Sequence, residues 1–142
     1  MEAQDQKTAG QLEREISQRV NALYRSELSH QPGKITCQLF ENKAVIVIEK
    51  SISRPEQLLK EHAKDDVAED AHAGIKAFFR EKVRESIEDL LQVKVLDTLF
   101  DSSLESHLSS VVVVLEKPPT VRNPAAIPKF PKSHLENGKV PD

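Results

Sequence analysis

Two stretches of the chain are apolar at every position instead of at every second one. They are residues 45–48, with the sequence VIVI, and residues 111–115, with the sequence VVVVL. Successive side chains of a strand point to opposite faces of its sheet, so a strand with one wet face alternates apolar and polar residues. Continuous β-branched runs therefore predict strands that are covered on both faces.

The rest of the pattern predicts two helical segments and two further strands. Apolar residues recur at helical spacing in one set of segments and alternate in the other. The predicted helices are residues 11–28 and 54–92; the predicted strands are 34–40, 44–50, 93–100 and 110–116, with a polar loop at 101–109. The first two strands form a hairpin across a short turn.

Both helices begin with a capping box. Thr8 precedes Gln11 by three residues, and Ser53 precedes Glu56 by three. At this spacing the side chain of each residue can accept a hydrogen bond from the backbone N–H of the other. The second helix is too long to keep a stripe repeated every four residues on one side, because that stripe drifts about 40° per step. A break near residues 64–66 follows.

The order of helix, two strands, helix and two strands predicts an α+β domain. It is a two-layer α-β-β-α-β-β unit with a four-stranded antiparallel sheet and its helices on one face. The other face then presents Val45, Val47, Val112 and Val114, joined by Leu96. Each buried valine contributes about 1.5 kcal/mol or more, so a second protein surface is expected to cover them, and we expect a homodimer.

Two monomeric alternatives stay open for that face. The first half of the long helix could fold across it, or the C-terminal tail could do so through Ile127 and Phe130.

The composition divides the 142 residues into three parts. Residues 1–10 are expected to be flexible, residues 11–117 to form the domain, and residues 118–142 to be a disordered basic tail that holds six of the eight prolines. Too few apolar groups occur in the tail to offset the entropy of ordering it. Such a tail is suited to docking a partner, and equally to keeping the chain soluble.

Charge and apolar content exclude several classes. The net charge is −3, with an acidic body, so we expect no nucleic-acid partner, because that affinity comes from neutralising phosphates. No apolar run approaches the length needed to cross a bilayer, and the N-terminus lacks a secretory pattern. A single cysteine agrees with a reducing compartment. We expect a cytoplasmic protein without membrane insertion.

Acidic and histidine side chains in the long helix form a candidate metal site. Its members are His62, Asp66, Glu69 and Asp70. They fall three or four residues apart, so a continuous helix would place them on one side, where imidazole and carboxylate could bind a divalent ion. The ordinary alternative is a solvated acidic helix face.

Basic side chains further along form a candidate ligand site. Lys76, Arg80 and Arg84 stand four residues apart and, with Asp101 and His107 of the polar loop, could hold a phosphate, a nucleotide or an acidic partner. The ordinary alternative is pairing with the neighbouring glutamates.

No catalytic residues are expected. Cys37 lies on the core-facing side of its strand, and His30 has no serine, cysteine or carboxylate partner in a recognisable order. The four glycines are scattered, so they form no phosphate-binding loop. We expect a protein that is not an enzyme and has no cofactor.

Residues 11–118 resemble the MpsC-like domain, a small bacterial domain of largely unknown function. The matching features are the first helix through Tyr24, the Pro32-Gly33 turn, the strand at 45–49, the helix start at 51–57, the long helix with Phe78-Phe79-Arg80 and residues 87–90, and the strands at 93–101 and 111–116. The chain departs from the family in the loop at 101–107, where only Asp101 is an aspartate and no proline occurs, and in the turn at 30–33.

The resemblance implies a link to a sodium-translocating, membrane-potential-generating system and to inorganic-carbon supply. Together with the doubly apolar strands, it leads us to expect a regulatory, protein-protein interaction domain that assists a membrane transporter subunit. The alternative is a small-metabolite or nucleotide-sensing domain.

Overall fold

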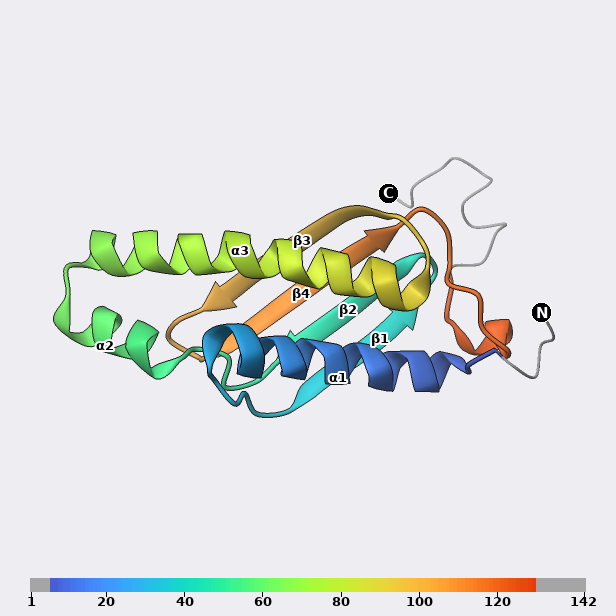
Figure 1. Ribbon diagram of the computed structural model, residues 1–142, viewed down its shortest axis with the longest axis horizontal. Coiled ribbons are helices and arrows are strands. Elements are labelled where there is room, and N and C mark those ends of the chain that lie inside the picture. The colour runs from blue at the N-terminus through green and yellow to red at the C-terminus, as the bar shows by residue number, and fades with distance from the viewer. Residues whose placement is uncertain (1–5, 130–142) are drawn as a thin grey trace, which may run out of the picture.

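The computed structural model describes residues 6–129 and arranges them in two layers, helices over a sheet (Figure 1). The elements in chain order are α1 (Ala9–Leu28), β1 (Ile35–Phe40), β2 (Lys43–Ile48), α2 (Arg54–His62), α3 (Asp65–Leu91), β3 (Val95–Ser103), β4 (Leu108–Leu115) and a short 3-10 helix (Pro124–Ala126).

This architecture confirms the α+β fold expected from the sequence. The four strands are antiparallel in the order β1-β2-β4-β3, so the two continuously apolar strands are central. Helices α1 and α3 lie side by side over one face of the sheet, while α2 and the beginning of α3 extend past its end (Figure 1). All three α-helices are therefore on the same side of the sheet.

The helix boundaries follow from local sequence. Thr8 and Gln11 form the capping box of α1, and Ser53 and Glu56 form that of α2. The expected break is confirmed, since α2 ends at His62 and α3 begins at Asp65. Each capping box satisfies backbone N–H groups that a helix start otherwise leaves without partners.

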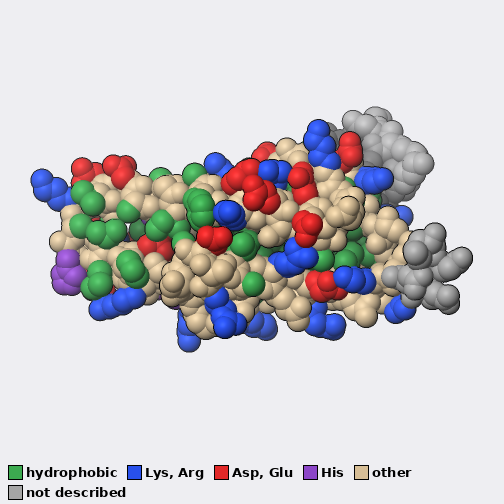
Figure 2. Space-filling view, in the orientation of Figure 1, with side chains coloured by type: hydrophobic (Ala, Val, Ile, Leu, Met, Phe, Trp, Pro, Cys, Tyr) green, Lys and Arg blue, Asp and Glu red, His purple; other side chains and the backbone are tan. Residues whose placement is uncertain are grey.

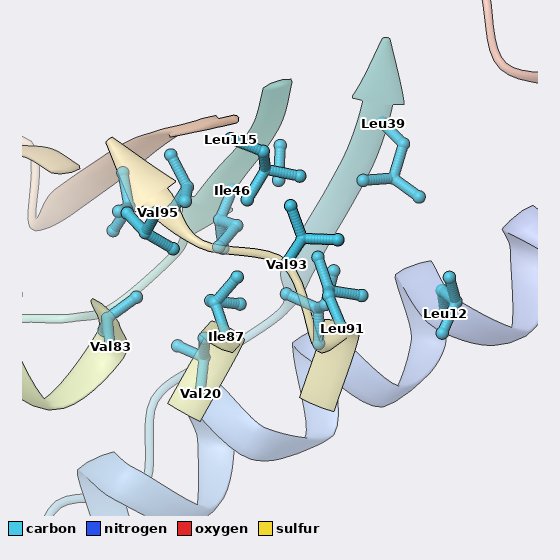
Figure 3. Close-up of a cluster of buried hydrophobic side chains, with 14 of the residues drawn as sticks. Leu12, Val20, Leu39, Ile46, Val83, Ile87, Leu91, Val93, Val95 and Leu115 are labelled. Atoms are coloured by element: carbon cyan, nitrogen blue, oxygen red, sulfur yellow. The ribbon is translucent and has the colours of Figure 1, made fainter. Parts of the chain in front are cut away.

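The core lies between the two helices and the inner face of the sheet. Val20 of α1 lies near Val83 and Ile87 of α3 there (Figure 3). These three side chains and Ile16 of α1 are fully buried. The sheet contributes its inward residues, which are Leu39, Ala44, Ile46, Ile48, Val111, Val113 and Leu115. An aromatic group closes one end, where the rings of Tyr24 and Phe79 are 4.3 Å apart between centroids.

The third and fourth strands are longer than the pattern predicts. β3 runs to Ser103 and β4 begins at Leu108, because Ser102 pairs with Ser109 and Ser103 with Leu108. The predicted polar loop at 101–109 is thus a tight turn between extended strands. Because serines occupy these positions, the alternation of apolar and polar residues stops there, and the sequence pattern did not indicate strand pairing.

The chain after β4 corrects the expected disordered tail for residues 118–129. Val121 and Ile127 are buried in the core cluster. The backbone is fixed as well: the Arg122 N–H donates to the Lys7 carbonyl at 2.9 Å, and the Ala9 N–H donates to Asn123 Oδ1 at 2.8 Å. These same bonds fix the residues before α1, so the segment 1–10 is ordered at least from Lys7.

The structure contradicts one of the two monomeric alternatives for covering the outer sheet face and describes only part of the other. The beginning of the long helical segment packs beside α3 on the helical side, not across the sheet (Figure 1). Ile127 belongs to the core cluster, whereas Phe130 and the rest of the predicted tail lie outside the described residues.

Adjacent phenylalanines provide a test of this packing. Phe79 is fully buried, between Tyr24 and Phe100, whereas Phe78 is 45% exposed. Phe79→Ala should lower the free energy of unfolding by about 3–5 kcal/mol, because it opens a cavity. Phe78→Ala should cost less than about 1 kcal/mol. Urea unfolding followed by circular dichroism measures both, and equal losses would contradict the burial described.

Candidate functional site

The outer face of the sheet is an apolar surface that the described helices leave uncovered. Across the strands, Val45 of β2 pairs with Val112 of β4, which pairs with Leu99 of β3. Val47 is 39% exposed and Leu99 56%. Val45, Val112 and Val114 are half-buried by their neighbours in the sheet.

The predicted interface residues share this face. Val45, Val47, Val112 and Val114 all point away from the inward residues of their strands, as alternation requires. Leu99 was missed. A register shift between Val95 and Asp97 changes which β3 residues face outward, and the sequence VLDTLF carries no clear sign of that irregularity.

The face has two opposite charges on one row of the sheet. Lys43 of β2 pairs with Val114, which pairs with Asp97 of β3. On the other side, Lys43 pairs with Phe40, and its Nζ lies 5.5 Å from that ring centroid. The Lys43 Nζ also lies 3.8 Å from Glu41 Oε1, so the basic charge toward β1 is partly neutralised, while Asp97 makes the row acidic toward β3.

The predicted ligand-binding residues do not converge on one pocket. Lys76 contacts Asp101, with 3.3 Å between Nζ and Oδ1, and Arg84 is held by Glu81 and Glu88 of the same helix. Arg80 is exposed on α3. His107 lies on the β3–β4 turn, beside a hollow of about 80 Å³ that Lys60 of α2 also lines.

Ion pairing already neutralises much of this basic line. The Glu81 carboxylate raises the pKa of Arg84 above its usual range, and Arg84 in turn lowers the pKa of Glu81. The Ser102 backbone N–H, followed by Lys76, lowers the pKa of Asp101. Glu88 also accepts from the Val95 N–H at 2.8 Å. Arg84 therefore helps to fix the end of α3 to the start of β3.

The predicted metal ligands are separated by the helix break. His62 ends α2, where its Nε2 lies 3.5 Å from Glu61 Oε2, while Asp66, Glu69 and Asp70 belong to α3. Within residues 6–129, no group of three or more His, Cys, Asp or Glu side chains is arranged to hold a metal ion. The spacing argument assumed one continuous helix, which the turn at Ala63 and Lys64 interrupts.

A buried polar cluster links α2, α3 and the sheet, and sequence reasoning did not find it. Glu56, 6% exposed, accepts from Ser53 and lies 2.7 Å from His72, between Oε2 and Nδ1. Beside it, the Ser109 hydroxyl bonds to those of Ser51 and Ser102. The capping box gave a signal for Glu56, but its partner on α3 depends on how the two helices meet.

This cluster has no room for a substrate. The cavity that it lines is about 10 Å³, the space of a single water molecule. His72 Nε2 and Thr98 Oγ1 have no hydrogen-bond partner among the described residues. The cluster thus joins elements of the fold and offers no open site for chemistry.

Burial controls two further titratable groups. It raises the pKa of Tyr24 to about 12, an effect to which the charge of Glu56 adds. It likewise raises the pKa of Cys37 to about 12, with a further contribution from Glu13. Cys37 packs against the core cluster, as expected for a small hydrophobic residue, and a protonated thiol is a poor nucleophile. His30 Nε2 lies 2.7 Å from the Lys50 carbonyl.

The geometry defines a small two-layer domain whose most distinctive surface is a bare apolar sheet face. The family model of the Na⁺-translocating membrane potential-generating system (MpsC) matches residues 8–117, and the chain belongs to the MpsC family. No curated protein and no solved structure matches it. None of the described helices is both long and apolar enough to span a bilayer.

Tyrosine burial predicts a loss of stability in alkaline solution. The folded pKa of Tyr24 is about 12 against 10.0 ordinarily, so the unfolded chain loses the proton first. The free energy of unfolding should be unaffected by this group below pH 10 and fall by about 2–3 kcal/mol as the pH rises to 12. Urea unfolding against pH measures it.

The matched comparison uses Cys37→Ala in both chains, which removes the thiol titration. Cys37→Ala alone should show the full loss between pH 10 and 12, whereas Cys37→Ala with Tyr24→Phe should lose clearly less. Identical pH profiles would contradict the assignment to Tyr24.

Proposed function

We propose that this domain is a non-catalytic, homodimeric regulatory module of a membrane ion or inorganic-carbon transport system, acting in the cytoplasm. The link to ion transport is supported by the family name. The observation that carries the dimer is the bare sheet face. Four strands about 4.8 Å apart and about six residues long span about 400 Å² in all. The apolar part of this face is its centre, on β2, β4 and Leu99, because β1 presents Thr36 and Gln38 there.

The cost of leaving this face in water supports a covering surface. Val47 is 39% exposed and Leu99 56%, and they stand beside three half-buried valines. An apolar side chain gains about 1.5–3 kcal/mol on full burial, and the net stability of a whole domain is only about 5–15 kcal/mol. Pairing this surface therefore has a gain comparable with the stability of the fold.

Charge complementarity favours a second copy as the covering surface. A two-fold axis parallel to the strands places β1 of one copy over β3 of the other. Lys43 of β2 then lies over Val114 of the partner subunit, one strand away from the partner subunit's Asp97, because all three residues belong to one row of the sheet. The symmetry repeats this arrangement, so Lys43, which already lies 3.8 Å from Glu41 of its own chain, gains a second nearby carboxylate and Asp97 gains a nearby cation.

The alternative function, sensing of a small metabolite or nucleotide, has less support. Lys76 and Arg84 are already engaged with carboxylates. One feature favours a ligand: a shallow hollow of about 350 Å³ at the end of the outer face, lined by Asp101 and several serines. The lining holds five serines and Asp101, which is already paired with Lys76, so it suits a neutral polar molecule better than a phosphate.

The dimer is tested by placing a charge in the centre of the face. Val112→Glu should convert a dimer of the full chain into a monomer, because a carboxylate would be buried against an apolar surface. Sedimentation velocity measures the change. Gln18→Glu, which adds the same charge to the exposed side of α1, should leave the dimer unchanged. A wild-type chain that sediments as a monomer at all concentrations would contradict the proposal.

Charge reversal tests whether the partner is a second copy. Lys43→Asp should weaken the dimer by about tenfold or less, as expected for a partly exposed pair. Lys43→Asp combined with Asp97→Lys should restore it, since the pair is re-formed with its signs exchanged. Sedimentation equilibrium gives the dissociation constants. A double variant no tighter than Lys43→Asp would count against this arrangement of the two copies.

A further inference from the structure

We infer that α2 and the first half of α3, residues 54–78, form a docking surface for a basic amphipathic helix of a partner protein. This segment is called the arm below. It extends past the end of the sheet (Figure 1), and its surface is separate from the outer face that carries the proposed dimer. The inference therefore does not depend on that dimer.

The arm buries few of its apolar side chains. In α2 the only buried residue is Glu56, and in the part of α3 before Phe79 the only one is Ala68. Leu58 is 40% exposed and Val67 47%. A nine-residue helix such as α2 is marginal in water by itself and depends on tertiary packing. The contacts within the arm leave apolar side chains such as Leu58 and Val67 without packing partners that would bury them.

Three exposed residues of α3 and the half-buried Ala71 form one stripe. Val67, Ala71, Gly74 and Phe78 are spaced four, three and four residues apart, so they lie along one side of the helix. Figure 2 shows apolar side chains gathered over the arm, with acidic side chains along one edge and basic side chains along the other. This is the pattern of anchors on which helix-in-groove recognition depends.

Gly74 has no internal reason to be glycine. It lies in the middle of α3, where glycine costs about 0.5–1 kcal/mol relative to alanine. A Cβ added at this position would meet nothing within 4 Å, so the packing within the chain does not require its absence. A glycine at the centre of an exposed apolar stripe lets a second backbone approach closely.

The charges of the arm select the kind of partner. Residues 65–70 carry four exposed acidic side chains and no basic one. Asp66 and Asp70 stand four residues apart and border the stripe on one side. The exposed basic side chains of the arm, Arg54, Lys60 and Lys64, lie on α2 and at the break before α3, so the partner helix needs its own basic side chains on the edge that meets residues 65–70. A helix with lysine or arginine beside its apolar side has the complementary charge.

The two helices of the arm are joined to each other before any partner binds. Glu56 of α2 contacts His72 of α3 at 2.7 Å, and the Gln57 amide donates to the Ile52 carbonyl at 2.9 Å. The apolar stripe is thus held on a preformed pair of helices, which lowers the conformational cost of docking.

The test uses the full chain and a labelled 20-residue peptide made of leucine and lysine, with the leucines at helical spacing. Fluorescence anisotropy should show saturable binding that weakens with added salt. The same peptide with glutamate in place of lysine should bind at least tenfold more weakly.

Gly74→Leu is the decisive variant, because it blocks close approach without a clash inside the chain. It should weaken binding of the lysine peptide by about tenfold or more while leaving the unfolding midpoint unchanged or higher. The matched control is Leu96→Gln, which alters an exposed leucine of the sheet layer and should leave peptide binding unchanged. Asp66→Asn with Asp70→Asn should weaken binding and reduce its salt dependence, whereas Glu105→Gln should not.

Three results would overturn the inference: no saturable binding, equal weakening by Gly74→Leu and Leu96→Gln, or a change of oligomeric state caused by Gly74→Leu, which would mean that a second copy occupies the arm. Val112→Glu separates the two proposals. It should abolish the dimer but keep peptide binding, so failure of either proposal leaves the other standing.

Discussion

The pairing of β2 with β4 is the constraint on which the rest of the structure depends. Ile46 opposite Val111 supplies the inner face, and Val45 opposite Val112 supplies the outer face. A sheet whose two central strands are apolar on both faces needs a covering layer on each side. The described helices provide one such layer, so the same residues that build the core also create the demand for a second surface.

The two halves of α3 differ in how much they contribute to covering the sheet. Its second half covers the sheet through Phe79, Val83, Ile87 and Leu91, whereas its first half buries only Ala68. Covering the sheet does not require the first half. Its continuation into a helical pair with α2 adds exposed apolar surface and acidic charge, which a domain built only for stability would have no reason to carry.

Local patterns were sufficient to predict most of the fold. The two capping boxes, the break before Asp65 and the doubly apolar central strands each depend on residues close together in the chain. The valines of the candidate interface followed from simple alternation once the inner face was assigned. These features could be read from the sequence because a single physical rule governs each of them.

The features that the sequence could not supply depend on contacts between distant segments. The outward position of Leu99 follows from an irregularity in the pairing of β3, and the contact of Glu56 with His72 follows from the angle at which two helices meet. Val121 and Ile127 are two apolar residues in a proline-rich segment. They are ordered because the start of α1 offers backbone partners to Arg122 and Asn123, which no local pattern reveals.

The two proposed surfaces combine in one geometry. In a dimer built on the outer sheet faces, the helical layers point outward, so neither arm is covered by the partner. A two-fold axis parallel to the strands reverses the order of the strands but not the direction along them. Both arms, which extend past the same end of each sheet (Figure 1), then project from one end of the dimer. When one arm has bound a dimeric or repeated partner, the second arm is held close to the next binding segment. The high effective concentration makes the second binding event more favourable than it is for a single arm. Dimerisation through the sheet face would in that way make the pair of arms bind an assembled transport complex more tightly than its separate subunits.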